Sequence, residues 1–321
     1  MKKNLPTTKS RLAHERHAQV FCICALAFML VQWVVFYVYG NINNILLAFQ
    51  RFDAQTGSQV FYDAPNMFKN FTDFFSDLFS GQNLTSYFLN GVIMHLVTLV
   101  ALPVSIMFSF IIYKKLPLKG LFKVVLYLPT IISSMVVALF FRYFVEYGLA
   151  GMWRTLFGAD LPTLIMDPYN AFPTMLVYCF FTSVPGSLLL NLGTMSRIPD
   201  DLVEVGQIEG FSLWQEFIHL TVPMMFPILQ VYCLGIFTGF FTQQGPLFAI
   251  YGNGAGIKAP EGTITFGYYM TLQVIGDNGG GDNRFMYGYT TAANLTIGLV
   301  SIPIIWGTKK LFDRFDPEAE F

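Results

Sequence analysis

The sequence predicts an all-helical membrane protein. Of its 321 residues, 54% are hydrophobic, 34 are Phe, and only 12% are charged. A water-soluble domain of this length has no interior large enough to bury so much apolar surface. Six apolar runs also reach the length of about 20 residues that a helix needs to cross the hydrocarbon core of a bilayer. They are residues 20–39, 89–113, 122–144, 172–192, 220–241 and 287–306.

Six spans place both ends of the chain on one side of the membrane, and the basic residues predict which side. Lys and Arg near the ends of spans favour the cytoplasm, whereas acidic residues have little influence. With both termini in the cytoplasm, 13 of the 19 Lys and Arg residues lie inside: five in the N-terminal tail, four between the second and third spans, one at Arg197 and three in the C-terminal tail.

The spans divide the chain into predicted regions. These are a cytoplasmic tail at 1–19, the first span at 20–39, an extracytoplasmic segment at 40–88, a transmembrane core at 89–306 with the other five spans, and a second cytoplasmic tail at 307–321. Basic residues precede the first run, as they do in a secretory signal peptide. That run is too long for a signal peptide and no small-residue cleavage pattern follows it, so we expect it to be retained.

Composition and motifs also exclude several functions. The formal net charge of -1 gives no basic footprint for nucleic acid. The four cysteines, Cys22, Cys24, Cys179 and Cys233, lie in apolar runs without the spacing of metal ligands, so they are expected to pack as small apolar groups. No Gly-x-x-x-x-Gly-Lys-Ser/Thr motif occurs, so the chain has no phosphate-binding loop with which to hydrolyse ATP itself.

Residues 195–219 form a polar interruption between the fourth and fifth runs, and they predict two short helices that meet at a bend. Pro199, followed by two aspartates, suits the start of a helix. Gly210 tolerates the left-handed backbone of a helix end. Ser212 and Gln215 have the spacing of a capping box, which would begin the second helix.

The second of these helices carries an apolar face in a position exposed to the cytoplasm. Its residues are Phe211, Leu213, Trp214, Phe217 and Ile218. Two interpretations remain open. The face packs on the ends of its own spans and anchors at the membrane interface, or it inserts into a groove of a soluble partner.

The same interruption resembles the coupling motif of permease subunits of ATP-binding-cassette (ABC) importers. That motif reads Glu-Ala-Ala, three residues, Gly, nine residues, Ile, any residue, Leu-Pro. Here its positions are held by Glu204, Val205, Gly206, Gly210, Leu220, Val222 and Pro223. Val205 and Gly206 replace the two alanines, where small side chains suggest close helix packing. We therefore call residues 195–219 the coupling segment.

Further matches are similar to the carbohydrate branch of these permeases, the maltose-permease type. They are Asn90, Leu-Tyr-Leu-Pro at 126–129, the aromatic stretch 141–149, and Tyr-Gly-Tyr-Thr-Thr-Ala-Ala at 287–293. The resemblance runs from about residue 86 to the C-terminus. The chain lacks the Gly-rich ending of the second permease in such systems, which favours the first-permease type, paired with a different subunit.

This resemblance implies partners and coupling residues. The partners are a second permease in a heterodimer, two ABC ATPase subunits that bind ATP and Mg, and an extracytoplasmic solute-binding protein, all at a bacterial plasma (inner) membrane; no cofactor is expected on this chain. The coupling residues are Glu204, Gly206, Glu209, Gly210, Phe211, Ser212 and Trp214. We expect the ATPases to move the coupling segment as the spans alternate between inward-open and outward-open states.

Two stretches resemble, by position, the places where maltose-type permeases contact sugar. They comprise Phe181, Thr182 and Ser183 in the fourth run, and Phe237, Phe240, Phe241 and Gln243 in the fifth. Transport sites favour Gly- or Pro-interrupted helices near the membrane middle, which supports a substrate pathway there. The competing interpretation is that these aromatic side chains face lipid or simply pack.

Ionisable residues inside the spans require partners because burying charge is costly. His95 either faces the pathway or makes a helix-to-helix hydrogen bond, and we favour the hydrogen bond. Arg142 and Glu146 lie four residues apart, and we expect them to form a mutual pair near the outer end of the third span.

The sequence therefore predicts the permease subunit of an ATP-driven importer for a carbohydrate, an oligosaccharide or glycan fragment. One alternative is an ABC permease for peptides or amino acids. Another is a secondary transporter or channel that works without an ATPase, although neither repeated halves nor an intramembrane charge relay are evident. A membrane enzyme is disfavoured, since no catalytic set of side chains is recognisable.

Overall fold

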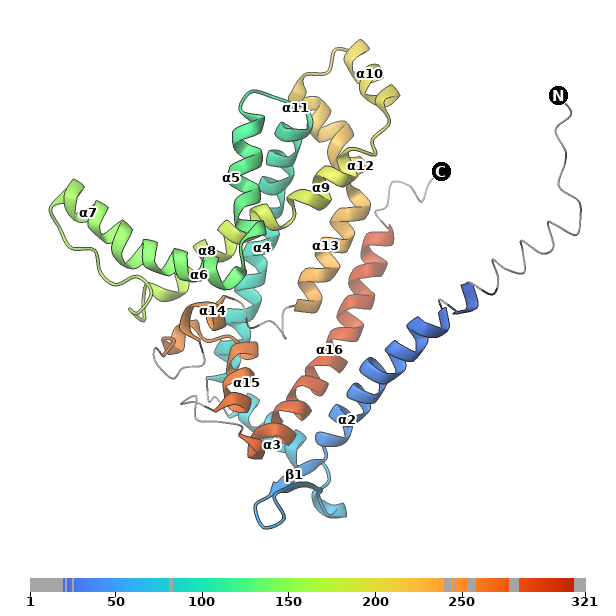
Figure 1. Ribbon diagram of the computed structural model, residues 1–321, viewed down its shortest axis with the longest axis vertical. Coiled ribbons are helices and arrows are strands. Elements are labelled where there is room, and N and C mark those ends of the chain that lie inside the picture. The colour runs from blue at the N-terminus through green and yellow to red at the C-terminus, as the bar shows by residue number, and fades with distance from the viewer. Residues whose placement is uncertain are drawn as a thin grey trace, which may run out of the picture.

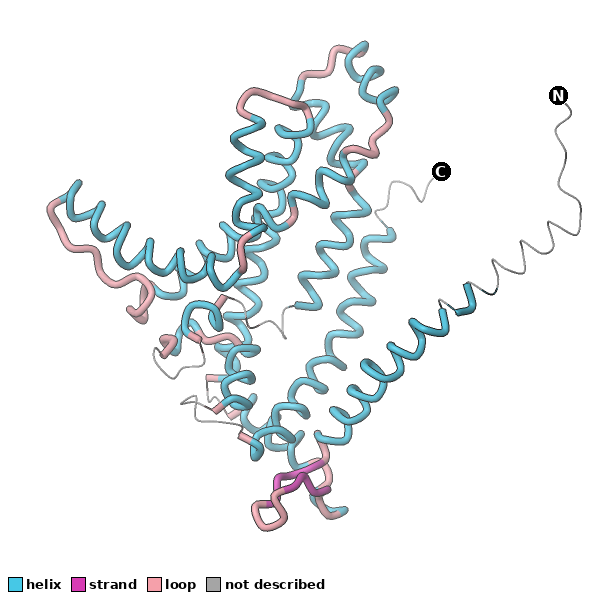
Figure 2. The backbone as a smooth tube through the Cα atoms, viewed as in Figure 1, coloured by secondary structure: helices cyan, strands magenta, loops and turns pink. Residues whose placement is uncertain are grey.

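The computed structural model describes residues 20, 22–24, 26–80, 83–239, 244, 246–252, 258–276 and 283–314. Five helices in it are long and apolar enough to cross a membrane: Cys22–Leu47, Leu84–Tyr113, Ser134–Phe157, Ala171–Met195 and Arg284–Arg314. A sixth span results if the bent pair Leu213–Met224 and Phe226–Gly239 is counted as one. Figure 2 shows that helix dominates the described residues, with one small hairpin. The predicted all-helical membrane architecture is confirmed at this level.

Helix α4 (Leu84–Tyr113) is the longest of the described elements and lies at the centre of their packing. Its 30 residues extend about 45 Å at 1.5 Å per residue. It packs along α8 (Ala171–Gly186) and α9 (Leu188–Met195). Where α8 ends, the Ser105 hydroxyl of α4 donates to the Val184 carbonyl at 2.7 Å. This bond satisfies a carbonyl at the helix break, so α4 is fixed to the broken span at that point.

The third predicted span, 122–144, is not one helix. Its region forms α5 (Lys119–Ile131), α6 (Ser134–Tyr143), the π-helix η3 (Phe144–Leu149) and α7 (Ala150–Phe157). The helix breaks at Ile132 and Ser133, whose ψ angles are 145° and 134°. Pro129 weakens the end of α5, because proline has no amide hydrogen and crowds the preceding turn. In Figure 1, α7 therefore stands away from α5 and from the bundle.

The fifth predicted span is also bent. Its elements are α11 (Leu213–Glu216), the π-helix η4 (Phe217–Thr221), α12 (Val222–Met224) and α13 (Phe226–Gly239). The bend of 66° falls at Met225, which is fully buried and lies between Pro223 and Pro227. The two prolines interrupt the hydrogen-bond ladder on either side of it, which accounts for the bend.

The segment that follows the first span folds against the last one. The first span ends with η1 (Trp33–Val38) and α2 (Tyr39–Leu47). The segment after it contains the antiparallel strands β1 (Gln50–Asp53) and β2 (Ser58–Phe61), η2 (Ala64–Asn66) and α3 (Lys69–Phe79). The last span contains η6 (Arg284–Met286) and α16 (Tyr287–Arg314). The buried Asn70 amide donates to the carbonyls of Ala48 and Gln50 at 2.8 and 2.9 Å. These bonds close the start of the hairpin over α16.

Four shorter elements complete the described structure: α10 (Asp200–Ile208), α14 (Leu247–Tyr251), η5 (Glu261–Thr263) and α15 (Phe266–Ile275). In Figure 1, α10 and α11 lie at one end of the molecule and the β1 hairpin at the other. Large apolar side chains cover the outside, with Phe36 exposed by 80% and Phe140 by 72%. Such a surface is stable in lipid rather than in water.

Candidate coupling segment and central cavity

The coupling segment begins with α10 and ends this helix at Gly210. Pro199, which the sequence predicts at the start of this helix, is the N-cap of α10, so the helix itself begins one residue later. Two aspartates follow in its first turn. Gly210 has a φ of +81°. The amide of Phe211 donates to the carbonyl of Gly206 at 2.9 Å, and that of Gly210 donates to Gln207 at 3.1 Å. This pair of bonds is the Schellman arrangement, in which a left-handed residue ends a helix and turns the chain sharply.

The second helix starts with the predicted capping box. The Gln215 amide donates to the Ser212 hydroxyl at 3.3 Å, and the Ser212 amide donates to the Gln215 side chain at 2.8 Å. Two backbone donors at the helix start are thus satisfied reciprocally. We call residues 205–214, where α10 meets α11, the elbow. Its bend is therefore specified by local sequence.

Gly206 is buried because the ring of Phe211 covers it. A Cβ atom at Gly206 would lie 3.2 Å from Cδ2 of Phe211. The close packing expected from the small side chain thus occurs within the elbow itself, between α10 and the residue after its bend.

Buried contacts anchor the elbow to the end of α4. Lys114, the C-cap of α4, forms an ion pair with Glu216 of α11. Beside this pair, the rings of Phe110 and Phe217 lie 5.1 Å apart. Neither charged residue was assigned this role from sequence, because each follows a long apolar or aromatic stretch and the two are distant along the chain. The signal available in the sequence was Glu216 itself, an acidic residue between Trp214 and Phe217 that needs a partner if it is buried.

The opposite face of the elbow is apolar and uncovered in the described part of the chain. Val205 is 51% exposed, Ile208 85%, Leu213 51% and Trp214 61%. Of the residues predicted to couple, Glu204, Glu209 and Ser212 are exposed as well. Phe217 is the exception in the predicted apolar face, since it packs inward on α4.

A central cavity of about 1280 Å³ lies among α4, α8, α13 and the break between α5 and α6. Thr182 and Ser183, two of the residues predicted for the substrate pathway, line it. Their hydroxyls donate to carbonyls one turn earlier in α8, at 2.9 Å to Tyr178 and 2.6 Å to Cys179, which leaves their lone pairs as acceptors.

The predicted aromatic residues of the pathway are placed differently. Phe181, which is 52% exposed, and Phe237 are both among the described residues and lie outside the lining of the cavity. Their neighbours on the helices, Thr182 and Ile236, take that position instead. The other three predicted pathway residues, Phe240, Phe241 and Gln243, fall outside the described residues.

His95 lines the central cavity. Its Nδ1 lies 2.9 Å from the carbonyl of Gly91, one turn earlier in α4. This hydrogen bond is within α4, so it is not the helix-to-helix bond that we favoured. The other ring nitrogen abuts α13, because a Cβ at Gly239 would lie 2.8 Å from Nε2.

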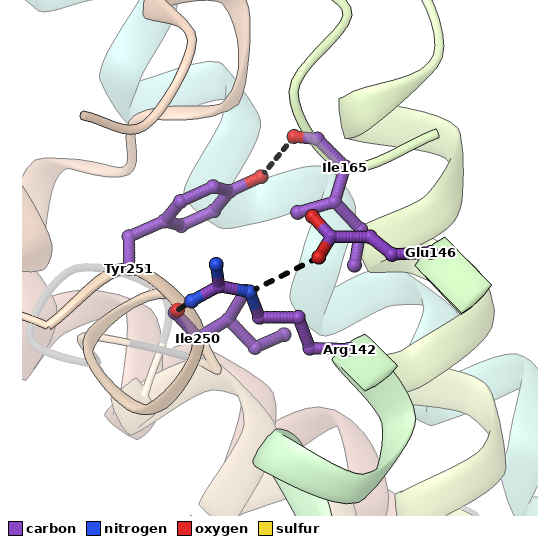
Figure 3. A network of polar contacts seen from close by, with 5 residues as sticks. All are labelled: Arg142, Glu146, Ile165, Ile250 and Tyr251. Carbon is purple, nitrogen blue, oxygen red and sulfur yellow. Dashed lines mark hydrogen bonds and ion pairs between the residues drawn. The ribbon is translucent and has the colours of Figure 1, made fainter. Parts of the chain in front are cut away.

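A polar network joins α6 to α14, as Figure 3 shows. The predicted pair is confirmed, with Nε of Arg142 3.5 Å from a carboxylate oxygen of Glu146. Arg142 also donates to the carbonyl of Ile250 at 3.4 Å, and the hydroxyl of Tyr251 donates to Ile165 at 2.7 Å. Burial raises the pKa of Tyr251 above its ordinary value, so the hydroxyl keeps the proton that it donates.

Comparisons with known proteins agree with this architecture. The chain is 25% identical over 299 residues to the probable ABC transporter permease protein YurN of Bacillus subtilis, across 91% of this chain and 94% of that protein. It is 25% identical over 262 residues to the maltose/maltodextrin transport system permease protein MalF of Escherichia coli, across 78% of this chain. Over most of its length the chain is thus similar to permease proteins of ABC transporters. The match to MalF spans about half of the length of MalF, 51%.

Solved structures extend the likeness to the fold. A chain of a bacterial ABC transporter involved in the import of the acidic polysaccharide alginate superimposes with a TM-score of 0.71 at 18% identity, covering 95% of this chain and 99% of that one. A chain of a bacterial alginate ABC transporter in complex with an alginate pentasaccharide-bound periplasmic protein gives a TM-score of 0.70 at 18% identity, covering 94% of this chain and 98% of that one. No family model matches the chain.

Proposed function

We propose that this permease carries a carbohydrate into the cell, and that separate ATPase subunits drive it through the coupling segment. The observation that carries the proposal is the connection between the elbow and the cavity. The coupling segment is anchored by Glu216 to the end of α4, and α4 lines the central cavity through Gly91, Met94, His95 and Thr98. One rigid helix therefore links a surface that a partner can move to a chamber that a substrate can occupy.

The uncovered face of the elbow supports an ATPase as its partner. Four large apolar side chains are about half exposed or more on a short, well-capped elbow, and such a face fits into a groove of another protein. The ATPases would bind ATP and Mg, since this chain has no phosphate-binding loop. In this arrangement the chain is not itself an enzyme and binds no cofactor.

The proposed orientation places the coupling segment and both termini in the cytoplasm of a bacterium, with the chain in the plasma membrane. The excess of Lys and Arg on that side supports it. An extracytoplasmic solute-binding protein would deliver the substrate at the hairpin end, and a second permease would complete the pathway as a heterodimer.

A carbohydrate is the substrate class that the cavity and the relatives favour. The cavity is lined by hydroxyl groups of Thr98, Thr182, Ser183 and Tyr232, which suit the hydroxyl groups of a sugar. Named relatives include a maltose/maltodextrin permease, and the fold is that of an alginate importer. Peptides and amino acids are the second class, and transport without an ATPase is the competing mechanism.

The complete transporter tests this proposal. The chain is co-expressed with the second permease, the ATPase subunits and the binding protein, and reconstituted into vesicles. We expect the binding protein loaded with maltotetraose or with an alginate tetrasaccharide to stimulate ATP hydrolysis and uptake, whereas peptides of similar size do not. Full transport by the permease without an ATPase subunit would contradict the proposal.

A further inference from the structure

A second cavity, of about 410 Å³, lies at the end of α4 opposite to the coupling segment. Six polar or aromatic residues in its wall are Tyr87, Glu261, Tyr268, Tyr269, Gln273 and Asn283. We call it the outer pocket. Tyr87 is in the first turn of α4 and Lys114 caps its far end, so the two lie about 40 Å apart along the helix. The outer pocket therefore faces the side of the protein away from the elbow.

Two tyrosine rings form an aromatic corner in the outer pocket. Those of Tyr87 in α4 and Tyr269 in α15 have centroids 5.3 Å apart and planes inclined by 42°. Gln273 lies one turn further along α15 and also lines the outer pocket. Burial raises the pKa of Tyr269, so its hydroxyl remains protonated at neutral pH. The corner thus combines aromatic surface with amide and hydroxyl groups, and sugars bind through both kinds of contact.

The wall between the outer pocket and the central cavity is held by Asn90 of α4. Its side-chain amide donates to the carbonyls of Gly262 and Ile264, at 3.0 Å each. Ile264 lines the outer pocket, while the next residue, Thr265, lines the central cavity. The two chambers are therefore neighbours that share a thin wall.

The size and charge of the outer pocket indicate the kind of ligand. Its volume falls within the range of about 300 to 1,000 Å³ that is common for small-molecule sites. One acidic residue, Glu261, and one basic residue, Lys258, line it, so neither sign of charge dominates. Recognition by such a lining depends on hydrogen bonds and aromatic contact more than on net charge.

We propose that the outer pocket binds a neutral sugar unit of the transported glycan and holds it before the glycan enters the central cavity. This inference rests on the proposed function. It assigns Tyr269 and Gln273 as direct contacts, and it places the first binding step on this chain outside the central cavity.

Protection of an introduced cysteine tests the outer pocket directly. In a chain whose four cysteines are replaced by Ser, Ala259→Cys, in the lining of the outer pocket, is labelled with a membrane-impermeant maleimide in the complete transporter without its binding protein. We expect at least one of maltotetraose, cellotetraose and xylotetraose to slow labelling several-fold, and Tyr269→Ala to abolish this protection. Tyr169→Cys, at a site 89% exposed and outside both cavities, is the control and should show no protection.

Further variants separate the outer pocket from the central cavity. Thr182→Val is expected to lower uptake but to leave the protection of Ala259→Cys unchanged; loss of protection in that variant would overturn the inference. If the transporter takes up a glycan but none of the three sugars changes the rate of labelling, the proposed role of the outer pocket is wrong while the proposed function stands. If the unmodified transporter takes up no glycan, the proposed function fails, and the inference fails with it.

Discussion

Lys114, at the end of α4, forms a buried ion pair with Glu216, in the first turn after the elbow. The side chains are 15% and 7% exposed. Buried pairs of this kind resist separation, because removal of one partner leaves an uncompensated charge away from water. The pair therefore keeps the elbow and α4 in a fixed relation, and a displacement of one must displace the other.

Glu216→Gln should uncouple ATP hydrolysis from transport. The neutral side chain leaves Lys114 buried without its counter-charge, at a cost of about 3–5 kcal/mol in comparable buried pairs. We expect the ratio of substrate-stimulated to basal ATP hydrolysis to fall towards one in reconstituted vesicles, while the ATPase subunits still co-purify.

The charge swap provides the control for this pair. Lys114→Glu combined with Glu216→Lys should restore much of the coupling, whereas Lys115→Met, at the exposed neighbour, should change little. Normal coupling in Glu216→Gln would show that the pair has no role in transmission.

Gly210→Val should weaken attachment of the ATPase without affecting membrane insertion. A φ of +81° costs a β-branched residue about 1–3 kcal/mol, so Val would favour another backbone conformation and the bend between α10 and α11 would be lost. The measurement is the amount of ATPase recovered per permease after mild solubilisation. Gly210→Asn should retain more ATPase, since Asn tolerates the left-handed region. Equal recovery from all three proteins would count against the elbow.

Gly239→Ala should disturb the central cavity at His95. The new Cβ would lie 2.8 Å from Nε2 of His95, so the ring must shift and its bond to Gly91 must lengthen. We expect a lower rate of uptake with normal assembly. Gly235→Ala, in the same helix and also in the cavity wall, meets nothing within 4 Å and should transport normally. Identical uptake by the two variants would contradict this packing.

Gly288→Ala should destabilise the junction of α16 with the hairpin. Its Cβ would lie 2.3 Å from the carbonyl oxygen of Gln50, a backbone atom that cannot rotate away. Overpacking of this kind costs about 1–3 kcal/mol or more. The thermal midpoint of the solubilised permease should fall, whereas Gly298→Ala, in open space on the same helix, should not lower it. A midpoint unchanged by Gly288→Ala would mean that the hairpin does not pack there.

The helical fold and the elbow could be predicted because local sequence specifies both. Length and apolarity identify the spans, while Gly210 and Ser212 fix the bend through backbone conformation and capping. The break at Ile132 was not predicted, because the sequence is apolar on both sides of it. Hydropathy depends on composition and does not indicate where the backbone leaves the helical conformation.

The site was harder to predict than the fold. Of the residues predicted for the substrate pathway, Thr182 lines the central cavity and Phe181 next to it does not, since adjacent residues on a helix face different directions. The pairing of Lys114 with Glu216 depends on how two distant helices meet, and periodicity contains no information about that contact.

The accessibility of Ile208 tests the central claim most directly. This side chain is 85% exposed at the tip of the elbow. In a chain whose own cysteines are replaced by Ser, Ile208→Cys is labelled with an impermeant maleimide in right-side-out and inside-out vesicles. We predict labelling only in inside-out vesicles, and protection when the ATPase subunits are bound. Labelling from the outside, or labelling that the ATPase does not reduce, would contradict the account.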